Sequence, residues 1–338
     1  MDWLACLYMR YRQLGNSDVK VSEISLGCWA LGGPSWAHGK PSGWAKVDEA
    51  EVTQAVKLAL DAGVNHFDNA DIYGNGEAER RLGRVLRRLG VSSERLVIAS
   101  KVGHFPGTAA HAYEPFHIRR QCEQSLLNLR RDYLDIYYLH HTNFGRNYEY
   151  LAPAAAVLDE LVREGKIRLK GQSAYTFKGF QIAVPVVRPT VLQSWAHAMA
   201  AEFIQAGNPL PRLMAEHQLS LVAFSPLNQG LLLGKYDPAR PPVFADGDHR
   251  SGQQKFLRPA LLDLKPRIER IKAHFGSRPD ILASVALRFV LNHDHVACVI
   301  PGFRDAGQVA CNLAVVNFQL SRAETNFVYQ TFNRKPRL

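Results

Sequence analysis

The feature that most constrains the fold is a regular alternation of short, β-rich apolar runs with longer helical patterns, which extends from residue 24 to residue 317. This alternation is typical of parallel sheets, because each parallel connection needs a crossover segment. The expected strands are Ile24–Trp29, Asn65–Asn69, Leu96–Val102, Tyr133–His140, Leu169–Ser173, Val191–Trp195, Leu221–Ser225 and Ala297–Pro301. The expected helices begin near Glu49, Glu77, Pro115, Pro153, Lys178, Pro209, Pro279 and Asp305.

Eight such units predict an α/β fold, a closed (β/α)8 TIM barrel, although an open doubly wound sheet would also alternate. No linker or internal repeat divides the 338 residues, so we expect one domain over residues 1–338. Residues 11–23 should form an N-terminal β-hairpin that plugs one end of the barrel. Residues 228–278, after the seventh strand, are too long for an ordinary loop. They should form a long loop plus a helix (261–275) that cover a cofactor site.

Composition excludes several classes of protein. Apolar residues make up 46% of the chain and charged residues 21%, which excludes disorder, collagen-like repeats and a coiled coil. No apolar run approaches the roughly 18 to 20 residues that cross a bilayer, so no membrane partner is expected. Five cysteines without a C-x-x-C pair indicate reduced thiols in a cytoplasmic protein. Because a second methionine stands at position 9, residues 1–8 are interpreted as an optional extension, with the barrel proper starting after residues 1–10.

The chain is basic, with 41 Lys or Arg against 31 Asp or Glu and a net charge of +10. The densest basic stretches recur at helical spacing beside Leu and Val, which favours a solvated helix face over a nucleic-acid interface. No helix-turn-helix, zinc finger or aromatic RNA-binding strand accompanies them, so no nucleic acid partner is expected. These basic residues are Arg80, Arg81, Arg84, Arg87, Arg88, Arg119, Arg120, Arg130 and Arg131.

Polar side chains follow three neighbouring predicted strands. Asp68 and Tyr73 follow the second strand, Lys101 ends the third and His140 ends the fourth. In a (β/α)8 barrel the chemistry lies at the C-terminal ends of the strands, so an acid, a phenol, an amine and an imidazole would meet at one rim. Singly, each has a structural explanation, such as a helix cap or core packing. Together they predict an active site.

These motifs resemble those of the aldo-keto reductase family. The resemblance rests on Phe-Asp-Asn-Ala-Asp-Ile-Tyr-Gly, Ala-Ser-Lys, Leu-His, Gly-Gln-Ser, Ser-Pro-Leu and Ile-Pro-Gly, which occur in the family's order through almost the whole chain. It implies an oxidoreductase that reduces a ketone or aldehyde to an alcohol by hydride transfer from NADPH. It also implies a catalytic tetrad of Asp68, Tyr73, Lys101 and His140.

The residue types explain how such a tetrad would work. Hydride transfer puts negative charge on the carbonyl oxygen, which must be protonated. A free phenol has a pKa near 10, and a nearby ammonium lowers that pKa. We therefore expect Lys101 to lower the pKa of Tyr73 and Asp68 to hold Lys101. His140 would orient the carbonyl, and Tyr73 would act as the general acid.

The resemblance further implies residues that hold the nicotinamide and the pyrophosphate. Ser173 and Gln193 match residues that bind the nicotinamide amide, whereas Ala174 replaces an Asn and removes one hydrogen bond of about 1 kcal/mol. Phe224 matches an aromatic residue that stacks on the nicotinamide. The other expected cofactor residues before strand eight are Trp29, Asp68, Ser225, Leu227, Gly230 and Lys235.

The adenine end of the cofactor is expected around strand eight and the helix after it, at Gly302, Arg304, Gln308 and Asn312. Arg304 could pair with a 2′-phosphate, because a guanidinium stays charged and matches phosphate geometry. This favours NADPH (NADP+) over NADH. In the NADH alternative, Arg304 only stacks on adenine.

Aromatic loops predict a fairly apolar pocket for a ring-bearing ketone or aldehyde, such as a sugar-like, terpenoid or polycyclic compound. Its expected residues are Trp29, Trp36, Phe105, His141 and Phe144, although His141 would instead face away from His140 if its strand continued. His293-Asp294-His295 resembles a set of metal ligands but precedes strand eight, on the face away from the site, so no metal is expected.

Two other functions stay open. The first is an NADP-dependent alcohol or sugar dehydrogenase that works in the reverse direction. The second is a non-catalytic NADPH-binding regulatory subunit, as some family members are when associated with channels. The sequence does not distinguish a monomer from a homo-oligomer.

Overall fold

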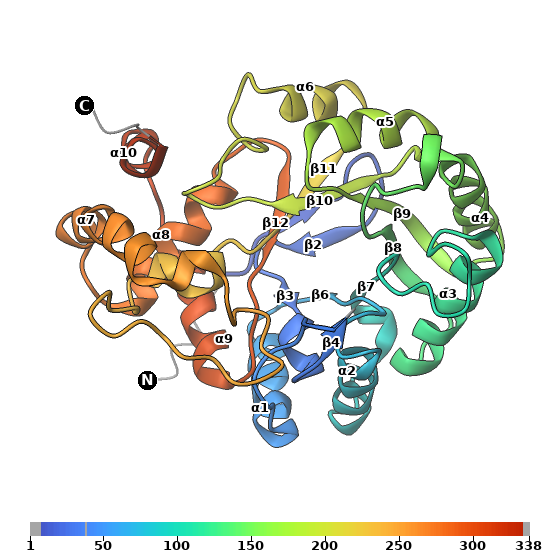
Figure 1. Ribbon diagram of the computed structural model, residues 1–338, viewed down its shortest axis with the longest axis horizontal. Helices are drawn as coiled ribbons and strands as arrows, with labels where there is room; N and C mark the ends of the chain where they lie inside the picture. Colours follow the sequence, from blue (N-terminus) through green and yellow to red (C-terminus); the bar gives the residue numbers. More distant parts are fainter. Residues whose placement is uncertain (1–7, 38, 334–338) are drawn as a thin grey trace.

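Eight parallel strands form the centre of the computed structural model, which describes residues 8–37 and 39–333 (Figure 1). Their order around the sheet is β12-β11-β10-β9-β8-β7-β6-β3. Parallel bridges between Ile24 and Val299 and between Gly27 and Gly302 join the two outer strands and complete the ring. The predicted barrel and its eight strands are confirmed: β3 (Leu26–Gly27), β6 (His66–Asp68), β7 (Val97–Val102), β8 (Leu134–Leu139), β9 (Ile167–Ser173), β10 (Val191–Trp195), β11 (Ser220–Phe224) and β12 (Val296–Ile300).

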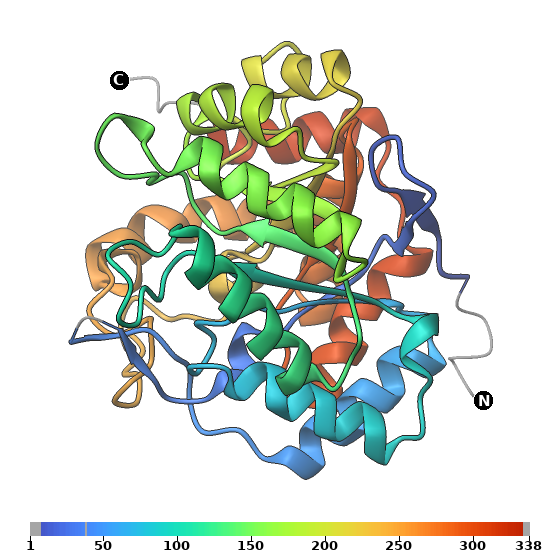
Figure 2. The same ribbon diagram turned by 90° about the vertical axis from the view of Figure 1, so that its right-hand side faces the viewer.

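Helices surround the barrel on its outside (Figures 1 and 2). Several of these helices begin at a residue type that favours the first helical turn. Asp48 caps α1 by accepting hydrogen bonds from the backbone N–H groups of Ala50 and Glu51. Proline, whose missing N–H costs nothing there, opens three others. The helices are α1 (Glu49–Asp61), α2 (Glu77–Arg88), α3 (Pro115–Leu129), α4 (Leu151–Arg163), α5 (Phe177–Val187), α6 (Pro209–Glu216), α7 (Arg258–Phe275), α8 (Pro279–Leu291), α9 (Ala306–Leu313) and α10 (Arg322–Asn333).

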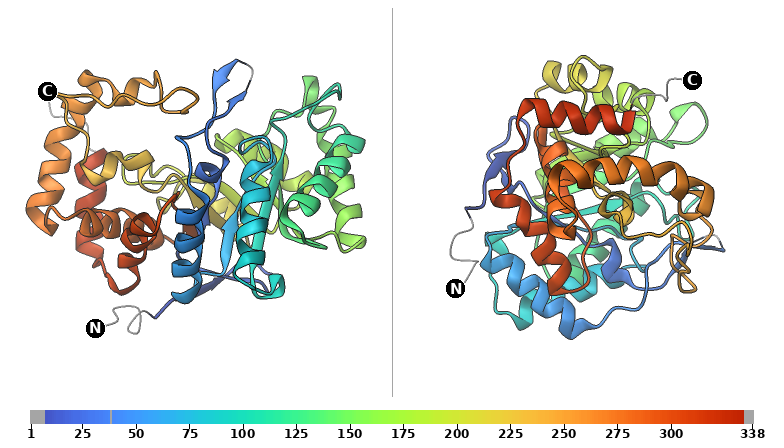
Figure 3. Two further views of the ribbon diagram at one scale, coloured as in Figure 1. Left: turned by 90° about the horizontal axis from the view of Figure 1, so that it is seen from below. Right: turned by 90° about the vertical axis from the view of Figure 1, so that its left-hand side faces the viewer.

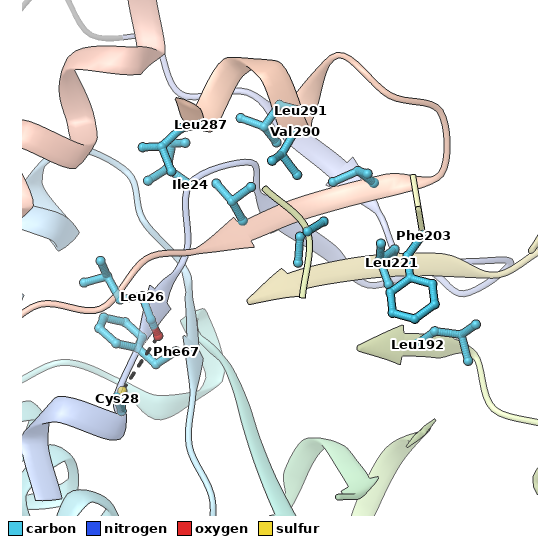
Figure 4. Packing of buried hydrophobic residues seen from close by; sticks show 14 of the residues in the cluster. Ile24, Leu26, Cys28, Phe67, Leu192, Phe203, Leu221, Leu287, Val290 and Leu291 are labelled. Carbon is cyan, nitrogen blue, oxygen red and sulfur yellow. Dashed lines mark hydrogen bonds between the residues drawn. The ribbon is translucent and has the colours of Figure 1, made fainter. Parts of the chain in front are cut away.

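The larger apolar core lies between the strands and these helices. Leu287, Val290 and Leu291 of α8 pack near Ile24 and the ribbon of β12 (Figure 4). These four side chains are buried, with at most 2% of their surface exposed. Burial of this kind stabilises the fold by about 1.5 to 3 kcal/mol per large apolar side chain.

The N-terminal hairpin closes one end of the barrel, as predicted. Its strands β1 (Tyr11–Gln13) and β2 (Lys20–Ser22) pair antiparallel. Leu14, Val19 and Val21 are buried among side chains that point into the barrel. That interior cluster includes Val97, Ile136, Tyr138, Val191, Val222 and Cys298.

A buried ion pair between Glu23 and Arg288 connects the elements at this closed end. Glu23 is fully buried and accepts two hydrogen bonds from Arg288, at 2.7 and 3.1 Å. Arg12 and Arg10 each add a contact at 3.1 Å. Met9 is also buried in the core. Met9 and Arg10 therefore pack with the barrel; residues 1–7 of the expected extension lie outside the described residues.

The basic stripe of α2 is paired with carboxylates. Arg84 binds both Glu49 and Glu77, and Arg88 also reaches Glu49. On α3, Arg119 binds carboxylates of the neighbouring α4 in the same manner. These pairs fit a solvated helix face, where each contributes little stability. Within the described ranges, no helix has both the length and the hydropathy that a bilayer span requires.

Two long segments meet on the side of the barrel opposite to the hairpin plug. One carries the small hairpin of β4 (Trp36–Ala37) and β5 (Lys40–Pro41), and the other is the insertion after β11. The backbone of Gly43 donates to Gly247 O at 3.1 Å and accepts from His249 N at 2.7 Å. Both segments project from the same side (Figure 3). The predicted loop-plus-helix insertion is thus present, with α7 as its helix.

Candidate active site

A cavity of about 460 Å³ opens at the C-terminal ends of the barrel strands, under the two long segments. It is large enough for a small-molecule ligand. Most of the residues predicted for a site share its wall. These are Trp29, Asp68, Tyr73, His140, Gln193, Phe224, Ser225, Leu227, Gly230, Lys235, Gly302, Arg304, Gln308 and Asn312.

The structure brings the four predicted tetrad residues together at one end of this cavity. Asp68 ends β6, Lys101 lies on β7, and His140 directly follows β8. Lys101 Nζ donates to Asp68 Oδ2 at 2.5 Å and to the backbone oxygen of Asn69 at 2.6 Å. It also lies 3.3 Å from the hydroxyl of Tyr73. Because Lys101 is fully buried, these partners replace all of its water.

The turn that carries Tyr73 is held by a close backbone approach. Gly74 has φ +59°, and a Cβ there would lie 2.4 Å from the carbonyl oxygen of Gly32. Only glycine fits this position. The ring of Tyr73 stacks on Trp29 with centroids 5.9 Å apart, and its other side meets His140 at 5.9 Å. The phenol is therefore fixed between two cavity residues.

The electrostatics of Tyr73 correct one prediction. Burial, with the negative charge of Asp68 second, raises the pKa of Tyr73 well above its usual value. We predicted that Lys101 would lower it. The ammonium lies close enough, but its charge is balanced by Asp68 at 2.5 Å, so burial prevails. Tyr73 is thus fully protonated at neutral pH and holds a proton that it can donate.

His140 is a neutral imidazole. Burial is the main cause that lowers its pKa well below the usual value, with smaller contributions from His104 and Lys101. Its ring meets that of His104 at 4.4 Å. Its buried Nδ1 has no hydrogen-bond partner in the part of the chain that the structure describes. A neutral imidazole suits a hydrogen bond to a carbonyl oxygen better than it suits proton release.

Gln193 and Ser173 occupy facing positions on β10 and β9. The amide of Gln193 donates to Asp68 Oδ1 at 2.7 Å. Ser173 is fully buried but lies outside the cavity wall, and its hydroxyl has no partner among residues 8–37 and 39–333. A buried, unsatisfied polar atom in a natural fold calls for a missing partner.

The other end of the cavity gathers positive charge. Burial and then the charges of Arg250 and Arg304 lower the pKa of Lys235. Cations that crowd one another are unfavourable unless an anion compensates them. The backbone beside them is unusual, since Ser225, Asn228, Gln229 and Gly230 all have positive φ. Such a run can turn its N–H groups toward an anion, and strain of this kind is typical of functional sites.

Arg304, Gln308 and Asn312 line this same end. Gln308 Oε1 accepts from the backbone N–H of Arg304 at 3.1 Å. Asn312 is 3% exposed, and its side-chain nitrogen has no partner in the described ranges. A dinucleotide phosphate fits this end, because its anionic groups match the cations and its adenosine offers acceptors to Asn312.

The structure places four predicted pocket residues outside the cavity wall. Trp36 and Phe105 are 48% and 45% exposed, because their loops extend away from the barrel. His141 lies outside the wall although β8 ends at Leu139; its ring contacts the carbonyl oxygen of Gly103 at 2.7 Å and packs against the buried Tyr113. Phe144 is fully buried in the core and packs on another ring. Of the predicted pocket, Trp29 alone lines the cavity.

The cavity wall also contains residues that the sequence analysis did not select, including Tyr175, His249 and Arg250. Trp29 contacts the rings of Trp44 at 5.4 Å and His249 at 4.6 Å. His249 and Arg250 belong to an irregular part of the insertion with no recognisable motif. Tyr175 directly follows Ser173-Ala174, and this adjacency is the one signal that could have identified it.

The His293-Asp294-His295 stretch precedes β12, so it lies at the other end of the barrel from the cavity. His293 Nδ1 contacts the carbonyl oxygen of Phe289 at 2.8 Å, a contact that closes the end of α8. Among the described residues there is no group of three or more metal-ligating side chains placed to share an ion. Four cysteines, at positions 28, 122, 298 and 311, are unpaired; Cys6 lies outside the described residues.

Comparison with known proteins adds an independent finding. The model of the aldo/keto reductase family matches residues 23–330. A probable voltage-gated potassium channel subunit beta of Arabidopsis thaliana is 27% identical over 319 residues, 91% of this chain and 92% of that protein. The L-glyceraldehyde 3-phosphate reductase of Escherichia coli (strain K12) is 28% identical over 325 residues, 91% of this chain and 88% of that protein.

A solved structure gives the same fold. The glycerol dehydrogenase of Gluconobacter oxydans superposes with a TM-score of 0.77 and 25% sequence identity, over 95% of this chain and 94% of that one. The similarity includes the barrel and its insertions, because the coverage is nearly complete on both sides.

Proposed function

Because this chain belongs to the aldo-keto reductase family, we propose that it reduces a ketone or aldehyde to an alcohol with NADPH as the hydride donor and Tyr73 as the general acid. One observation carries this proposal. Lys101 Nζ joins Asp68 and the Tyr73 hydroxyl at the floor of a cavity whose other end is cationic. The bound dinucleotide would supply the hydride, and the residues of this chain would donate the proton.

Tyr73 would donate its proton to the oxygen of the substrate. The phenol is protonated at neutral pH, because burial raises its pKa. An alcohol is a weaker acid than a phenol, so the proton passes favourably to the oxygen once negative charge has formed there. The Lys101 ammonium, 3.3 Å from the Tyr73 hydroxyl, would stabilise the phenolate that remains. Asp68 would keep Lys101 in place.

His140 would orient the carbonyl. Its lowered pKa keeps the imidazole neutral, so one ring nitrogen can donate a hydrogen bond without competing with Tyr73 as the acid. The Nδ1 atom, which has no partner among the described residues, has further hydrogen-bonding capacity.

The proposed cofactor contacts include two residues, Ser173 and Asn312, whose buried polar atoms have no hydrogen-bond partner among the described residues. Ser173 and Gln193 would bind the nicotinamide amide, and Phe224 would stack on its ring. Ser225, Leu227, Gly230 and Lys235 would hold the pyrophosphate. Gly302, Gln308 and Asn312 would hold adenosine, and Arg304 would bind the 2′-phosphate, which is the basis for preferring NADPH over NADH.

The proposed substrate is a small carbonyl compound with a flat apolar face. Support comes from the catalytic end of the cavity, where Trp29 contacts the rings of Trp44 and His249 and Tyr175 lies near Phe224. Aromatic faces of this kind bind rings well. We also propose a cytoplasmic location, since the four described cysteines are unpaired.

A second function has a specific observation in its favour. The similarity to a probable potassium channel subunit beta covers nearly the whole chain, and it supports a non-catalytic NADPH-binding subunit as the alternative. The glycerol dehydrogenase likeness similarly keeps the oxidising direction open.

One assay separates these functions. NADPH absorbance is followed with a panel of carbonyls that runs from methylglyoxal to cyclohexanone and benzaldehyde derivatives, with NADH in parallel. Reduction of ring-bearing carbonyls with a preference for NADPH supports the proposal. Tight NADPH binding without turnover of any carbonyl or alcohol favours the regulatory subunit, and turnover of alcohols alone favours the dehydrogenase.

A further inference from the structure

One hydrogen bond crosses the barrel from wall to wall. Gln193 lies on β10 and Asp68 on β6, four places apart in a ring of eight strands and therefore opposite each other. The Gln193 amide donates to Asp68 Oδ1 at 2.7 Å, and both side chains are at most 2% exposed. The backbone of Gln193 pairs with the strands on both sides, so its amide starts from a rigid position.

The two oxygens of Asp68 have separate donors. Oδ1 accepts from Gln193, and Oδ2 accepts from Lys101 at 2.5 Å. The amide therefore fixes the rotation of the carboxylate and leaves Oδ2 directed at Lys101. Lys101 in turn lies 3.3 Å from the hydroxyl of Tyr73. Four side chains thus form one connected series from β10 to the phenol.

We propose that Gln193 is a positioning residue that keeps Asp68 ionised and directed at Lys101, and so keeps the ammonium next to Tyr73. This role goes beyond holding a nicotinamide amide. It rests on the proposed function for its catalytic consequence, but the hydrogen bond to Asp68 can be tested without turnover.

The physical reason is burial. With its side chain only 2% exposed, the Asp68 carboxylate depends on protein donors in place of water. Loss of the Gln193 donor leaves Oδ1 unpaired, which favours the protonated acid. A neutral Asp68 no longer balances the charge of Lys101. The ammonium then loses its proton more readily or moves away from Tyr73.

Other titratable groups face this carboxylate from the neighbouring elements. They remain uncharged around neutral pH, because burial lowers the pKa of His66 to about 4, raises that of Cys298 to about 12, and raises those of Cys28 and Tyr138. Tyr73 is likewise protonated. The ion pair between Asp68 and Lys101 therefore carries the charge in this part of the barrel.

The test uses Gln193→Leu, which keeps the volume of the side chain and removes the donor. Carbon-13 NMR of the aspartate carboxyls, with Asp68→Asn for assignment, follows the protonation of Asp68 in the full chain without substrate. We expect its midpoint to rise by about one pH unit or more, as loss of a buried donor predicts. The kcat should fall by about tenfold or more, with its acid limb shifted to higher pH.

Two further variants separate this role from cofactor binding. Protonated glutamate can donate to Asp68 whereas glutamate anion cannot, so Gln193→Glu should retain activity at acidic pH and lose it at alkaline pH. Ser173→Ala, the matched control, should weaken NADPH binding and leave the Asp68 midpoint unchanged. An unchanged midpoint and kcat profile in Gln193→Leu, with only the NADPH Kd raised, would overturn the inference. If the wild-type protein reduces no carbonyl, the proposed function fails, and the NMR midpoint still decides this inference.

Discussion

The two ends of the barrel each contain a buried ion pair, but they differ in how fully the pair is satisfied. At the hairpin end, Glu23 takes four guanidinium contacts, and Arg288 also donates to two backbone carbonyls. At the cavity end, Asp68 and Lys101 bind each other beside an open space. Near them, polar atoms of His140 and Ser173 have no hydrogen-bond partner among the residues that the structure describes.

This difference distinguishes a stabilising role from a functional role for buried ion pairs in one fold. A saturated pair has no capacity left for a ligand and acts on stability. A pair next to unsatisfied groups is poised for a partner that it does not yet have. Both ends pair a carboxylate with a basic side chain, so residue identity alone would not tell them apart.

The largest expected effect is on turnover, and it follows the loss of the cation at the cavity end. Lys101→Met removes the ammonium beside Tyr73, and turnover should fall by about a hundredfold to ten-thousandfold, the range of a general acid contribution. Steady-state assays at matched folded fraction, measured by circular dichroism, check this. Turnover close to that of the wild type would show that the pair at this end is structural too.

The corresponding change at the hairpin end should act on stability. Arg288→Met leaves Glu23 with only Arg10 and Arg12, and should lower the free energy of unfolding by about 3 kcal/mol, at the lower end for a broken buried pair. Urea unfolding measures this change. Turnover per folded molecule should stay the same, and a selective loss of kcat with normal stability would break the comparison.

A smaller effect is expected on cofactor specificity, at the cationic end of the cavity. Arg304→Ala should weaken NADPH binding by about tenfold to a hundredfold, as for a lost hydrogen-bonded charge pair. NADH binding should hardly change, because NADH lacks the 2′-phosphate. Fluorescence titrations with both cofactors measure this. An unchanged NADPH Kd would leave Arg304 as an arginine that only stacks on adenine.

The smallest expected effect is on the stability of the fold at acidic pH. Burial is the largest single influence on the pKa of Glu23 and raises it, but the hydrogen bond and charge of Arg288 together with the charges of Arg10 and Arg12 outweigh burial and lower the pKa. A depressed carboxyl pKa stabilises the fold above its unfolded value of about 4.5, and this stability is lost as the pH falls through the folded value. Glu23→Gln should therefore show a weaker loss of stability below that pH than the wild type, in unfolding experiments along a pH series. An identical acid limb would mean that other carboxyls control it.

The barrel and the tetrad could be predicted because the residues that indicate them lie within short segments of the sequence. Asp68, Lys101 and His140 stand at the ends of apolar runs, and the parallel topology then brings such ends together. The wall contributed by His249 and Arg250 was not predictable, because it depends on the pairing of residue 43 with residues 247 and 249 across an irregular loop. The orientation of Phe144 was missed for a similar reason. Its burial is set by a neighbouring ring, Tyr113, and not by its own segment.

The pKa of Tyr73 shows a further limit. Residue types indicated a cation near the phenol, and the structure contains it. The direction of the shift depends on burial and on how closely Asp68 balances Lys101. Neither quantity can be obtained from spacing along the chain.

The most direct test of the account is a single-turnover measurement of NADPH oxidation with a ring-bearing carbonyl, for the wild type and for Tyr73→Phe. Phenylalanine keeps the ring between Trp29 and His140 and removes only the hydroxyl. The account predicts that the hydride-transfer rate falls by at least about a hundredfold, while the NADPH Kd stays near the wild-type value. A Tyr73→Phe protein that oxidises NADPH as fast as the wild type would contradict the claim that this phenol delivers the proton.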